Sequence, residues 1–267
     1  MIKIKIDAYA LLRRIKKQRP LIHHLTNWVT IYGCANIVKA IGGSPVMAHA
    51  KEEVAEMAGM ASALVLNTGT ITVDFLRAMK IAARSANKKG IPVILDACGA
   101  GATIFRDKSC FQLLNDVRVD ILKGNVSEIA RIAGEDVRTK GVDSTRIKID
   151  MRRLARGLAL KRRCTVVVTG QEDIVCDGQK TFIIKNGHPM MGYMVGTGCM
   201  AASVIATFAA VEKDSAHAAV CGLLCFEVAA ECAAKKSKGP GSFKDNLYDC
   251  MYALDKRMIS RMQKVYQ

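Results

Sequence analysis

The apolar run Ala63-Leu64-Val65-Leu66 ends at the polar turn Asn67-Thr68-Gly69-Thr70. A stretch with helical periodicity follows at residues 74–88, and a second apolar run, Pro92-Val93-Ile94-Leu95, ends at Asp96. Apolar runs without alternation indicate strands that are buried on both faces. A strand, a helix and a second strand in this order predict a parallel βαβ unit.

The same alternation extends on both sides of this unit. Residues 174–176 and 181–184 flank Asp177-Gly178, a hairpin turn signal. The segment 44–49 has no periodicity and is expected to be irregular. Further strands are expected at residues 21–25, 120–122 and 165–168, and helices at 7–18, 31–41, 51–60, 127–132, 147–160, 200–211, 215–235 and 243–262. We therefore expect one α/β domain over residues 1–267, with a mostly parallel central sheet, helices on both faces and a small antiparallel hairpin edge.

The composition indicates a globular protein, because 50% of the 267 residues are hydrophobic and 24% are charged. The ten cysteines form no C-x-x-C motif, and the N-terminus lacks the apolar core of a signal peptide. Cys221 and Cys225 lie one helical turn apart, but no second Cys or His pair joins them as metal ligands. No window approaches the length of a membrane span, since Glu227 interrupts residues 218–230. These features predict a cytoplasmic protein with reduced thiols.

The formal net charge of +16 favours anionic ligands. Nucleic acid is one such ligand, but the basic residues are scattered and no aromatic residues are interleaved with them. Since the sequence carries no nucleic-acid-binding motif, we expect a solvated basic surface rather than a nucleic-acid interface.

Polar residues stand where several expected strands end. In parallel α/β sheets, ligands bind outside the carboxyl ends of the strands. Carboxylates suit a hard cation, and lysine and threonine can bind phosphate oxygens. The set therefore suits a magnesium-bound nucleotide, and it comprises Asn67 with Gly69, Asp96, Lys123 with Asn125 and Glu128, and Thr169.

Each of these residues also has a purely structural interpretation. Asp96 and Thr169 could close loops, while Asn125 is an ordinary N-cap residue and Glu128 suits the first turn of the helix that follows. The adjacent His23 and His24 would face opposite sides of a strand, so at most one could reach a pocket.

The sequence Gly196-Thr197-Gly198-Cys199 directly precedes an apolar run at 200–211. Glycines before a helix leave first-turn N–H groups open to an anion, and a cysteine there has its pKa lowered by the helix dipole. This turn is either a phosphate cradle with a candidate base or a glycine loop that caps a core helix.

The chain carries a series of short motifs, which are, in order, Leu25-Thr26-Asn27, Gly43-Ser44-Pro45-Val46-Met47-Ala48-His49, Leu66-Asn67-Thr68-Gly69-Thr70, Leu95-Asp96, Gly99-Ala100-Gly101-Ala102-Thr103, Lys123-Gly124-Asn125, Ser127-Glu128, Lys140-Gly141-Val142-Asp143-Ser144, Val168-Thr169-Gly170, Asn186-Gly187-His188, Gly196-Thr197-Gly198-Cys199 and Pro240-Gly241-Ser242-Phe243. Their order resembles that of the hydroxyethylthiazole kinase family, from the first helix to the last.

The resemblance implies a ribokinase-like fold and ATP-dependent phosphorylation of the primary hydroxyl of 4-methyl-5-(2-hydroxyethyl)thiazole in thiamine salvage. It implies a homotrimer with active sites at subunit interfaces. By motif, Met47 and Gly196 would contact the thiazole, Asn27 and Gly69 would lie near its hydroxyl, and Cys199 would be nearest the reacting group. Lys123, Thr169, Asn125 and Gly198 would bind ATP, and Asp96 and Glu128 would handle Mg²⁺.

Three positions depart from the family pattern. Ala97-Cys98 replaces the usual Pro-Val after the aspartate, His23-His24-Leu25-Thr26-Asn27 replaces the usual His-x-Ile-Thr-Asn, and Lys123 replaces an arginine. Two alternative functions stay open: a kinase for hydroxymethylpyrimidine or pyridoxal, and a non-catalytic basic binding protein on the same fold. Whether Cys199 acts as a base or only positions the alcohol also stays open.

Overall fold

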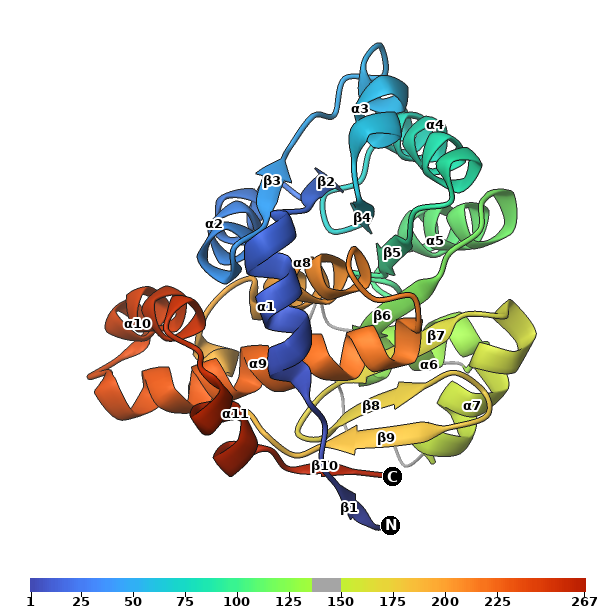
Figure 1. Cartoon of the computed structure of the whole chain (residues 1–267). Coiled ribbons are helices and arrows are strands. Elements are labelled where there is room, and N and C mark those ends of the chain that lie inside the picture. The colour runs from blue at the N-terminus through green and yellow to red at the C-terminus, as the bar shows by residue number, and fades with distance from the viewer. Residues whose placement is uncertain (136–149) are drawn as a thin grey trace.

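The computed structural model describes residues 1–135 and 150–267 and shows one mixed sheet with helices on both faces (Figure 1). Within these residues the strand order is β1-β10-β9-β8-β7-β6-β5-β4-β2-β3. The strands are β1 (Lys3–Ile4), β2 (Leu21–Leu25), β3 (Ser44–Val46), β4 (Ala63–Asn67), β5 (Val93–Asp96), β6 (Ile121–Asn125), β7 (Thr165–Thr169), β8 (Asp173–Cys176), β9 (Thr181–Ile184) and β10 (Val265–Tyr266).

The strands from β3 to β7 are parallel, whereas β8, β9, β10 and β1 continue the sheet in antiparallel pairs. The helices are α1 (Ala8–Gln18), α2 (Ile31–Ile41), α3 (Val54–Met60), α4 (Val73–Lys89), α5 (Ile104–Asp116), α6 (Val126–Ala133), α7 (Met151–Arg162), α8 (Thr197–Ala209), α9 (Ser215–Lys236), α10 (Pro240–Tyr252) and α11 (Lys256–Met262), with a 3-10 turn η1 (Pro189–Tyr193). This architecture confirms the expected α/β class with its antiparallel edge.

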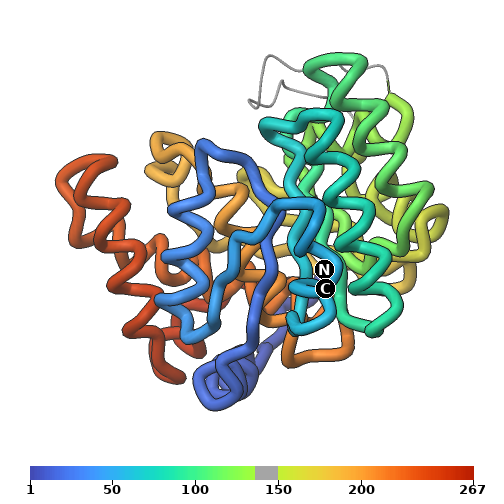
Figure 2. The backbone as a smooth tube through the Cα atoms, turned by 90° about the horizontal axis from the view of Figure 1, so that it is seen from above, coloured from blue at the N-terminus to red at the C-terminus, as the bar shows by residue number. Residues whose placement is uncertain are grey.

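Alternate residues of each parallel strand enter two different hydrophobic cores. Val65, Ile94 and Ile121 pack with α8 and α9, whereas Leu64 and Leu95 pack with α4 and α5 on the opposite face. Because side chains alternate along a strand, the residue two positions after Val65, Ile94 or Ile121 also faces α8 and α9. Figure 2 shows the two helical layers from above, with α3 to α7 on one side of the sheet.

The face under α8 and α9 is packed tightly because both helices carry small residues. A Cβ on Gly222 of α9 would lie 3.1 Å from the Cα of Ile205 in α8, so the two backbones nearly touch. Helix α9 is long and apolar enough to cross a membrane by length and composition, which the sequence analysis did not expect. Since 83% of its apolar window is buried inside the fold, its apolar character fits a core helix.

Several expected boundaries are wrong. The segment 44–49 was expected to be irregular, but its first three residues form β3 beside β2. The expected helix at 243–262 is two helices, because the chain leaves α10 at Ala253 and Asp255 caps α11 by accepting from the Met258 N–H at 2.7 Å. Helix α5 and the two-residue strands β1 and β10 were not expected.

The expected helix at 147–160 is found as α7, which begins at Met151. Residues 147–149 of that expectation, together with the motif Lys140-Gly141-Val142-Asp143-Ser144, lie outside the described residues.

His24 links β2 to α8 and is fully buried. Its Nδ1 lies 3.0 Å from the Ile22 carbonyl oxygen and its Nε2 lies 3.1 Å from the Ser203 hydroxyl. Burial lowers the pKa of His24 from 6.5 to about 4, against the backbone hydrogen bond, which raises it. His24 is therefore neutral in the folded protein at neutral pH.

This lowered pKa predicts acid destabilisation. The unfolded chain binds a proton on His24 that the folded chain does not, so the free energy of unfolding is highest above pH 6.5 and falls towards pH 4. The slope that His24 contributes reaches about 1.4 kcal/mol per pH unit. Urea unfolding at several pH values measures it. His24→Asn should have a flatter profile over this range, and an unchanged slope would contradict the assignment.

Candidate active site

Three polar side chains form a row across the parallel strands. Asn67 pairs in register with Asp96, and Asp96 pairs with Lys123. Each stands two residues after a core residue of the α8 face, namely Val65, Ile94 and Ile121, and therefore points towards α8. All three side chains are nearly fully buried. The prediction that polar strand ends converge is correct for this row.

Helix α8 completes the site with Cys199. The Cys199 sulfur lies 3.4 Å from the Asn27 Nδ2 and 3.3 Å from the Asn67 Nδ2, and both amides donate to it. Gly196 is the N-cap, so Cys199 is the third residue of the helix and lies in the turn whose N–H groups have no intrahelical acceptor. The glycine turn thus meets the strand ends.

Asn67 is the centre of this network, although it was named only as a polar strand end. Its Oδ1 accepts from the Asn27 Nδ2 at 2.9 Å and from the Gly69 N–H at 2.9 Å. Its Nδ2 donates to the Asp96 Oδ2 at 2.7 Å as well as to Cys199. Asn67 therefore connects the two expected alcohol-side residues, Asn27 and Gly69, to Asp96.

Lys123 and Asp96 form a buried ion pair. The Lys123 Nζ donates to the Asp96 Oδ1 at 3.1 Å, and both side chains are almost inaccessible to water. Burial alone would lower the pKa of Lys123, but the charges of Asp96 and Glu128 outweigh it and raise the pKa. Burial also raises the pKa of Asp96, while Lys123 opposes that effect. The lysine is therefore a fixed positive charge beneath the helix.

Cys98 is a neighbour of Cys199, a contact that the sequence does not predict. A hydrogen bond from its thiol lowers the pKa of Cys199 to about 7, against burial, which raises it. Asp96 raises the same pKa and Lys123 lowers it. A lowered thiol pKa was expected from the helix dipole, but its largest cause is this second cysteine.

Two glycines of the turn lie in close contact with other residues. Gly196 has a φ of +93°, and a Cβ there would lie 2.6 Å from the Thr30 methyl carbon. A Cβ on Gly198 would lie 3.1 Å from the Lys123 Nζ. Gly196 therefore fits α8 against the start of α2, and Gly198 leaves the lysine facing the helix N-terminus.

Asn125 and Glu128 form a capping box at the start of α6. The Asn125 Oδ1 accepts from the Glu128 N–H at 2.9 Å, and the Glu128 Oε2 accepts from the Asn125 N–H at 2.7 Å. The Glu128 Oε1 also accepts from the Gly99 N–H at 2.7 Å. The structural interpretation of these two residues is therefore correct, and Glu128 in addition holds the loop after Asp96.

The replacement of Pro-Val by Ala97-Cys98 has two structural consequences. The Ala97 N–H donates to the Lys123 carbonyl oxygen at 2.8 Å, a bond that proline cannot make. Cys98 brings its thiol to Cys199. The loop after Asp96 is thus tied to β6 and to α8.

Two expected residues lie at the margins of this network. Thr169 pairs in register with Asn125, and its hydroxyl donates to the Gly124 carbonyl oxygen at 3.4 Å. Met47 follows β3 and is partly buried against the α8 core. The His49 ring packs edge-on against Trp28 at 4.8 Å, which brings the loop of Met47 beside the residue that follows Asn27.

His23 and His24 face opposite sides of β2, as expected. His23 Nε2 lies 2.8 Å from the Ala48 carbonyl oxygen and so supports the Met47 loop, whereas His24 belongs to the core contact with Ser203. In the described part of the chain, no three His, Cys, Asp or Glu side chains gather as a ready-made metal site.

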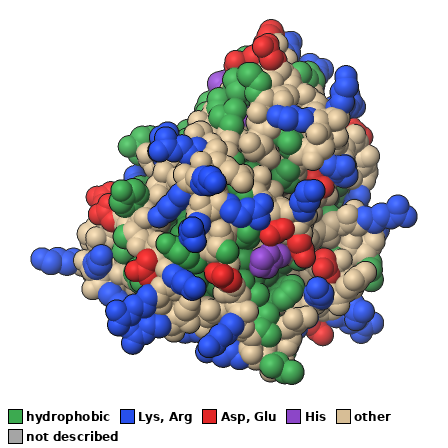
Figure 3. Space-filling model, viewed as in Figure 1, with side chains coloured by type: hydrophobic (Ala, Val, Ile, Leu, Met, Phe, Trp, Pro, Cys, Tyr) green, Lys and Arg blue, Asp and Glu red, His purple; other side chains and the backbone are tan. Residues whose placement is uncertain are grey.

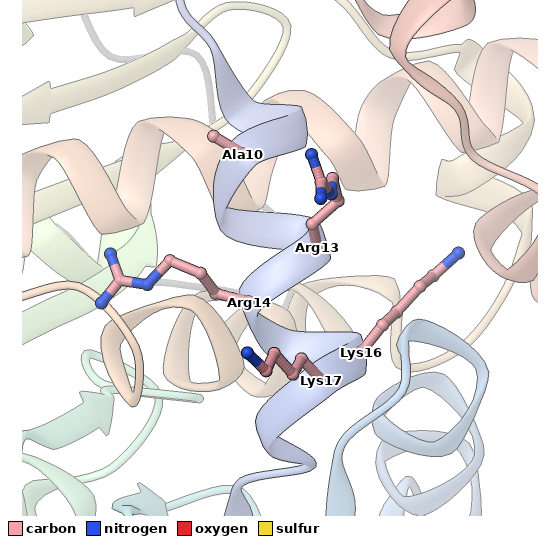
Figure 4. Close-up of a pocket in the computed structure, with 5 residues that line it drawn as sticks. All are labelled: Ala10, Arg13, Arg14, Lys16 and Lys17. Atoms are coloured by element: carbon pink, nitrogen blue, oxygen red, sulfur yellow. The ribbon is translucent and has the colours of Figure 1, made fainter.

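A basic hollow lies on the outer surface of α1, away from this network. It is lined by Ala10, Arg13, Arg14, Lys16 and Lys17 (Figure 4), none of which belongs to the strand-end site. On the face seen in Figure 3, lysine and arginine side chains are dispersed among acidic and apolar ones.

This chain is similar in sequence and fold to known hydroxyethylthiazole kinases. The model described as the hydroxyethylthiazole kinase family matches residues 12–257. The hydroxyethylthiazole kinase of Methanosarcina mazei is 54% identical over 95% of this chain and 97% of its own length. The solved hydroxyethylthiazole kinase structure from Pyrococcus horikoshii has a TM-score of 0.89 and 39% identity, and the match covers 97% of this chain and 98% of that one.

A more distant structure shows the wider fold alone. A ribokinase-like superfamily protein from Enterococcus faecalis matches with a TM-score of 0.63 and 12% identity, over 94% of this chain and 98% of that one. The expected ribokinase-like fold is therefore confirmed. With its matching family model and close relatives, the chain belongs to the hydroxyethylthiazole kinase family.

Proposed function

We propose that this protein transfers the terminal phosphoryl group of ATP to the primary hydroxyl of 4-methyl-5-(2-hydroxyethyl)thiazole, in thiamine salvage. The observation that carries the proposal is the contact of Cys199, in the first turn of α8, with the buried row of Asn67, Asp96 and Lys123. A phosphoryl-transfer site needs positioning and fixed positive charge, and this arrangement supplies both.

The alcohol is assigned to the side of the network that holds Asn27 and Gly69. Asn27 donates to the Cys199 sulfur and Gly69 is fixed by Asn67, so a hydroxyl bound there would meet the sulfur directly. Met47 and Gly196 would contact the thiazole ring. Cys199 would accept or hold the hydroxyl proton, and its lowered pKa supports that assignment.

The nucleotide is assigned to the side of Lys123 and Thr169. Lys123 carries a fixed positive charge that faces Gly198, and Thr169 ends the neighbouring strand β7. The free N–H groups of the Gly196 to Cys199 turn would stabilise negative charge on the transferring phosphoryl group. Asn125 contributes as the cap that shapes the start of α6.

Magnesium is assigned to Asp96 and Glu128. Both carboxylates are buried and lie close enough that the charge of Asp96 raises the pKa of Glu128, after burial, which is the larger cause. Their oxygens already accept hydrogen bonds, but each keeps a lone pair, and Mg²⁺ retains several waters when it binds proteins. Bound there, the ion would neutralise phosphate charge.

The assembly is assigned as a homotrimer of one-domain subunits, residues 1–267, with active sites at the interfaces. Trp28, Val29, Tyr193 and Val195 are large, exposed side chains on the two segments that meet at Thr30 and Gly196. An exposed apolar patch of this kind is typical of a protein interface. All ten cysteines lie in the described residues and are free, which supports a cytoplasmic location.

The reaction should be detected as ADP formation that requires both the thiazole alcohol and Mg²⁺. Hydroxymethylpyrimidine and pyridoxal are the comparison alcohols, and ADP release should be at least about tenfold slower with them. Equal rates with either of them would favour the alternative kinase. Absence of turnover with every alcohol, together with steeply salt-dependent binding to DNA or RNA, would favour the non-catalytic alternative.

Replacement of the thiol tests the part of Cys199. Cys199→Ala should lower kcat by about a hundredfold or more, because general-base contributions have this size. Nucleotide affinity, measured by calorimetry with ADP, should stay near that of the parent protein. A variant with full kcat would exclude the base and leave the helix amides as the working groups.

The interface is tested by the mass of the assembly. Sedimentation should give three times the 29.0 kDa chain mass for the parent protein. Tyr193→Glu should shift the protein towards monomer and lower activity, because a charge would be buried in the interface. Ile104→Asp is the control, since Ile104 is equally exposed but begins α5 on the other face of the sheet. A trimer that withstands Tyr193→Glu unchanged would place the interface elsewhere.

A further inference from the structure

Two buried carboxyl groups lie outside the network at Cys199. Asp173 is the first residue of β8 and Glu227 stands in the middle of α9. Their exposed fractions are 6% and 4%. Acidic side chains are almost never buried to this extent without a partner, so their contacts need an explanation.

The partner of each carboxyl group is the other one. The side chains of Asp173 and Glu227 hydrogen-bond to each other. Two ionised carboxylates have no proton to share and repel each other in a buried site, so the contact requires one bound proton. Burial and the charge of Asp173 raise the pKa of Glu227 well above its ordinary value. The pair therefore holds one proton, through which one carboxyl group donates to the other.

Other charged groups face this pair. Glu231 lies one turn further along α9 and raises the pKa of Glu227, while Lys264 lowers it and forms an ion pair with Glu231 at 3.0 Å. Lys123 lowers the pKa of Asp173 from the sheet side. The Glu227 Oε2 is buried and accepts no hydrogen bond from an N–H or hydroxyl group of the described residues. The contact with Asp173 is thus the main polar interaction of Glu227.

Asp173 also reaches the site. Its Oδ1 accepts from the Gly170 N–H at 2.9 Å and so closes the turn from β7 into β8. Gly170 directly follows Thr169, and a Cβ on Gly170 would lie 3.5 Å from Val126, the first residue of α6. The turn therefore lies where β7 and the start of α6 meet, beside Thr169 and Asn125.

We propose that Glu227 is a positioning residue that acts through Asp173, as the two share one proton and fix the Gly170 turn that presents Thr169 to the nucleotide. The proposal rests on the proposed function, since it uses the assignment of ATP to Thr169. Helix α9 and the sheet are thereby joined at the nucleotide side of the site, while the alcohol side depends on Asn27 and Asn67.

Two substitutions of Glu227 by side chains of similar length distinguish a positioning role from simple packing. Glu227→Gln keeps an N–H donor for Asp173, so the KM values for ATP and for the alcohol should both stay within about twofold of the parent. Glu227→Met removes the donor and leaves Asp173 buried with one partner fewer. It should raise the KM for ATP by about fivefold or more, with the KM for the alcohol unchanged. Glu172→Gln is the control, because this carboxylate lies on the same turn but is 43% exposed.

A spectroscopic measurement tests the shared proton without any assay of turnover. The infrared spectrum of the parent protein at neutral pH should contain the C=O stretch of a protonated carboxylic acid that is lost in Glu227→Gln. Identical bands in the two proteins would overturn the shared proton, even if the kinase assignment is correct. Equal rises of both KM values in Glu227→Met, or none, would overturn the positioning role. If Glu227→Met does not fold, the infrared comparison still tests the shared proton, on which the positioning role depends.

Discussion

The arrangement of the site depends on one buried charge, that of Lys123. A lysine ammonium beneath a helix is costly to bury unless a counter-charge lies in contact, and Asp96 supplies it from the adjacent strand. Asp96 in turn accepts from Asn67, and Asn67 holds Asn27 and Cys199. The ion pair thereby anchors a chain of hydrogen bonds across three strands and into α8, and each member has its orientation fixed by the next.

Much of this was predictable from the sequence because parallel strands end at one edge of a sheet. The apolar runs identified the central strands, and the polar residues after them, Asn67, Asp96 and Lys123, do meet under α8. Helix α8 begins at Thr197 rather than at the expected Met200, so Gly198 and Cys199 lie in its first turn and not before it. The capping box of Asn125 and Glu128 was also foreseen as a structural alternative, and it is present.

The parts that were missed depend on contacts that are distant in sequence. Strand β3 has three residues and includes Pro45, so only its pairing with β2 reveals it. Cys98 becomes part of the site only through its hydrogen bond with Cys199, which is distant from it in the sequence. The Asp173–Glu227 contact likewise joins a short strand to a long helix whose residues 218–230 carry no charged side chain other than Glu227. Short elements and paired side chains carry little local signal, because tertiary packing creates them.

The hydrogen bonds of the Asn67 side-chain amide limit which residues can replace it. Its Oδ1 has two donors and its Nδ2 has two acceptors, so the four partners together determine which way the amide faces. Aspartate differs from it by one group and would keep the two accepted bonds. It would lose both donated ones and set a second carboxylate against Asp96. Asn67 therefore cannot be replaced by aspartate, the residue most similar to it in shape, without the loss of these hydrogen bonds.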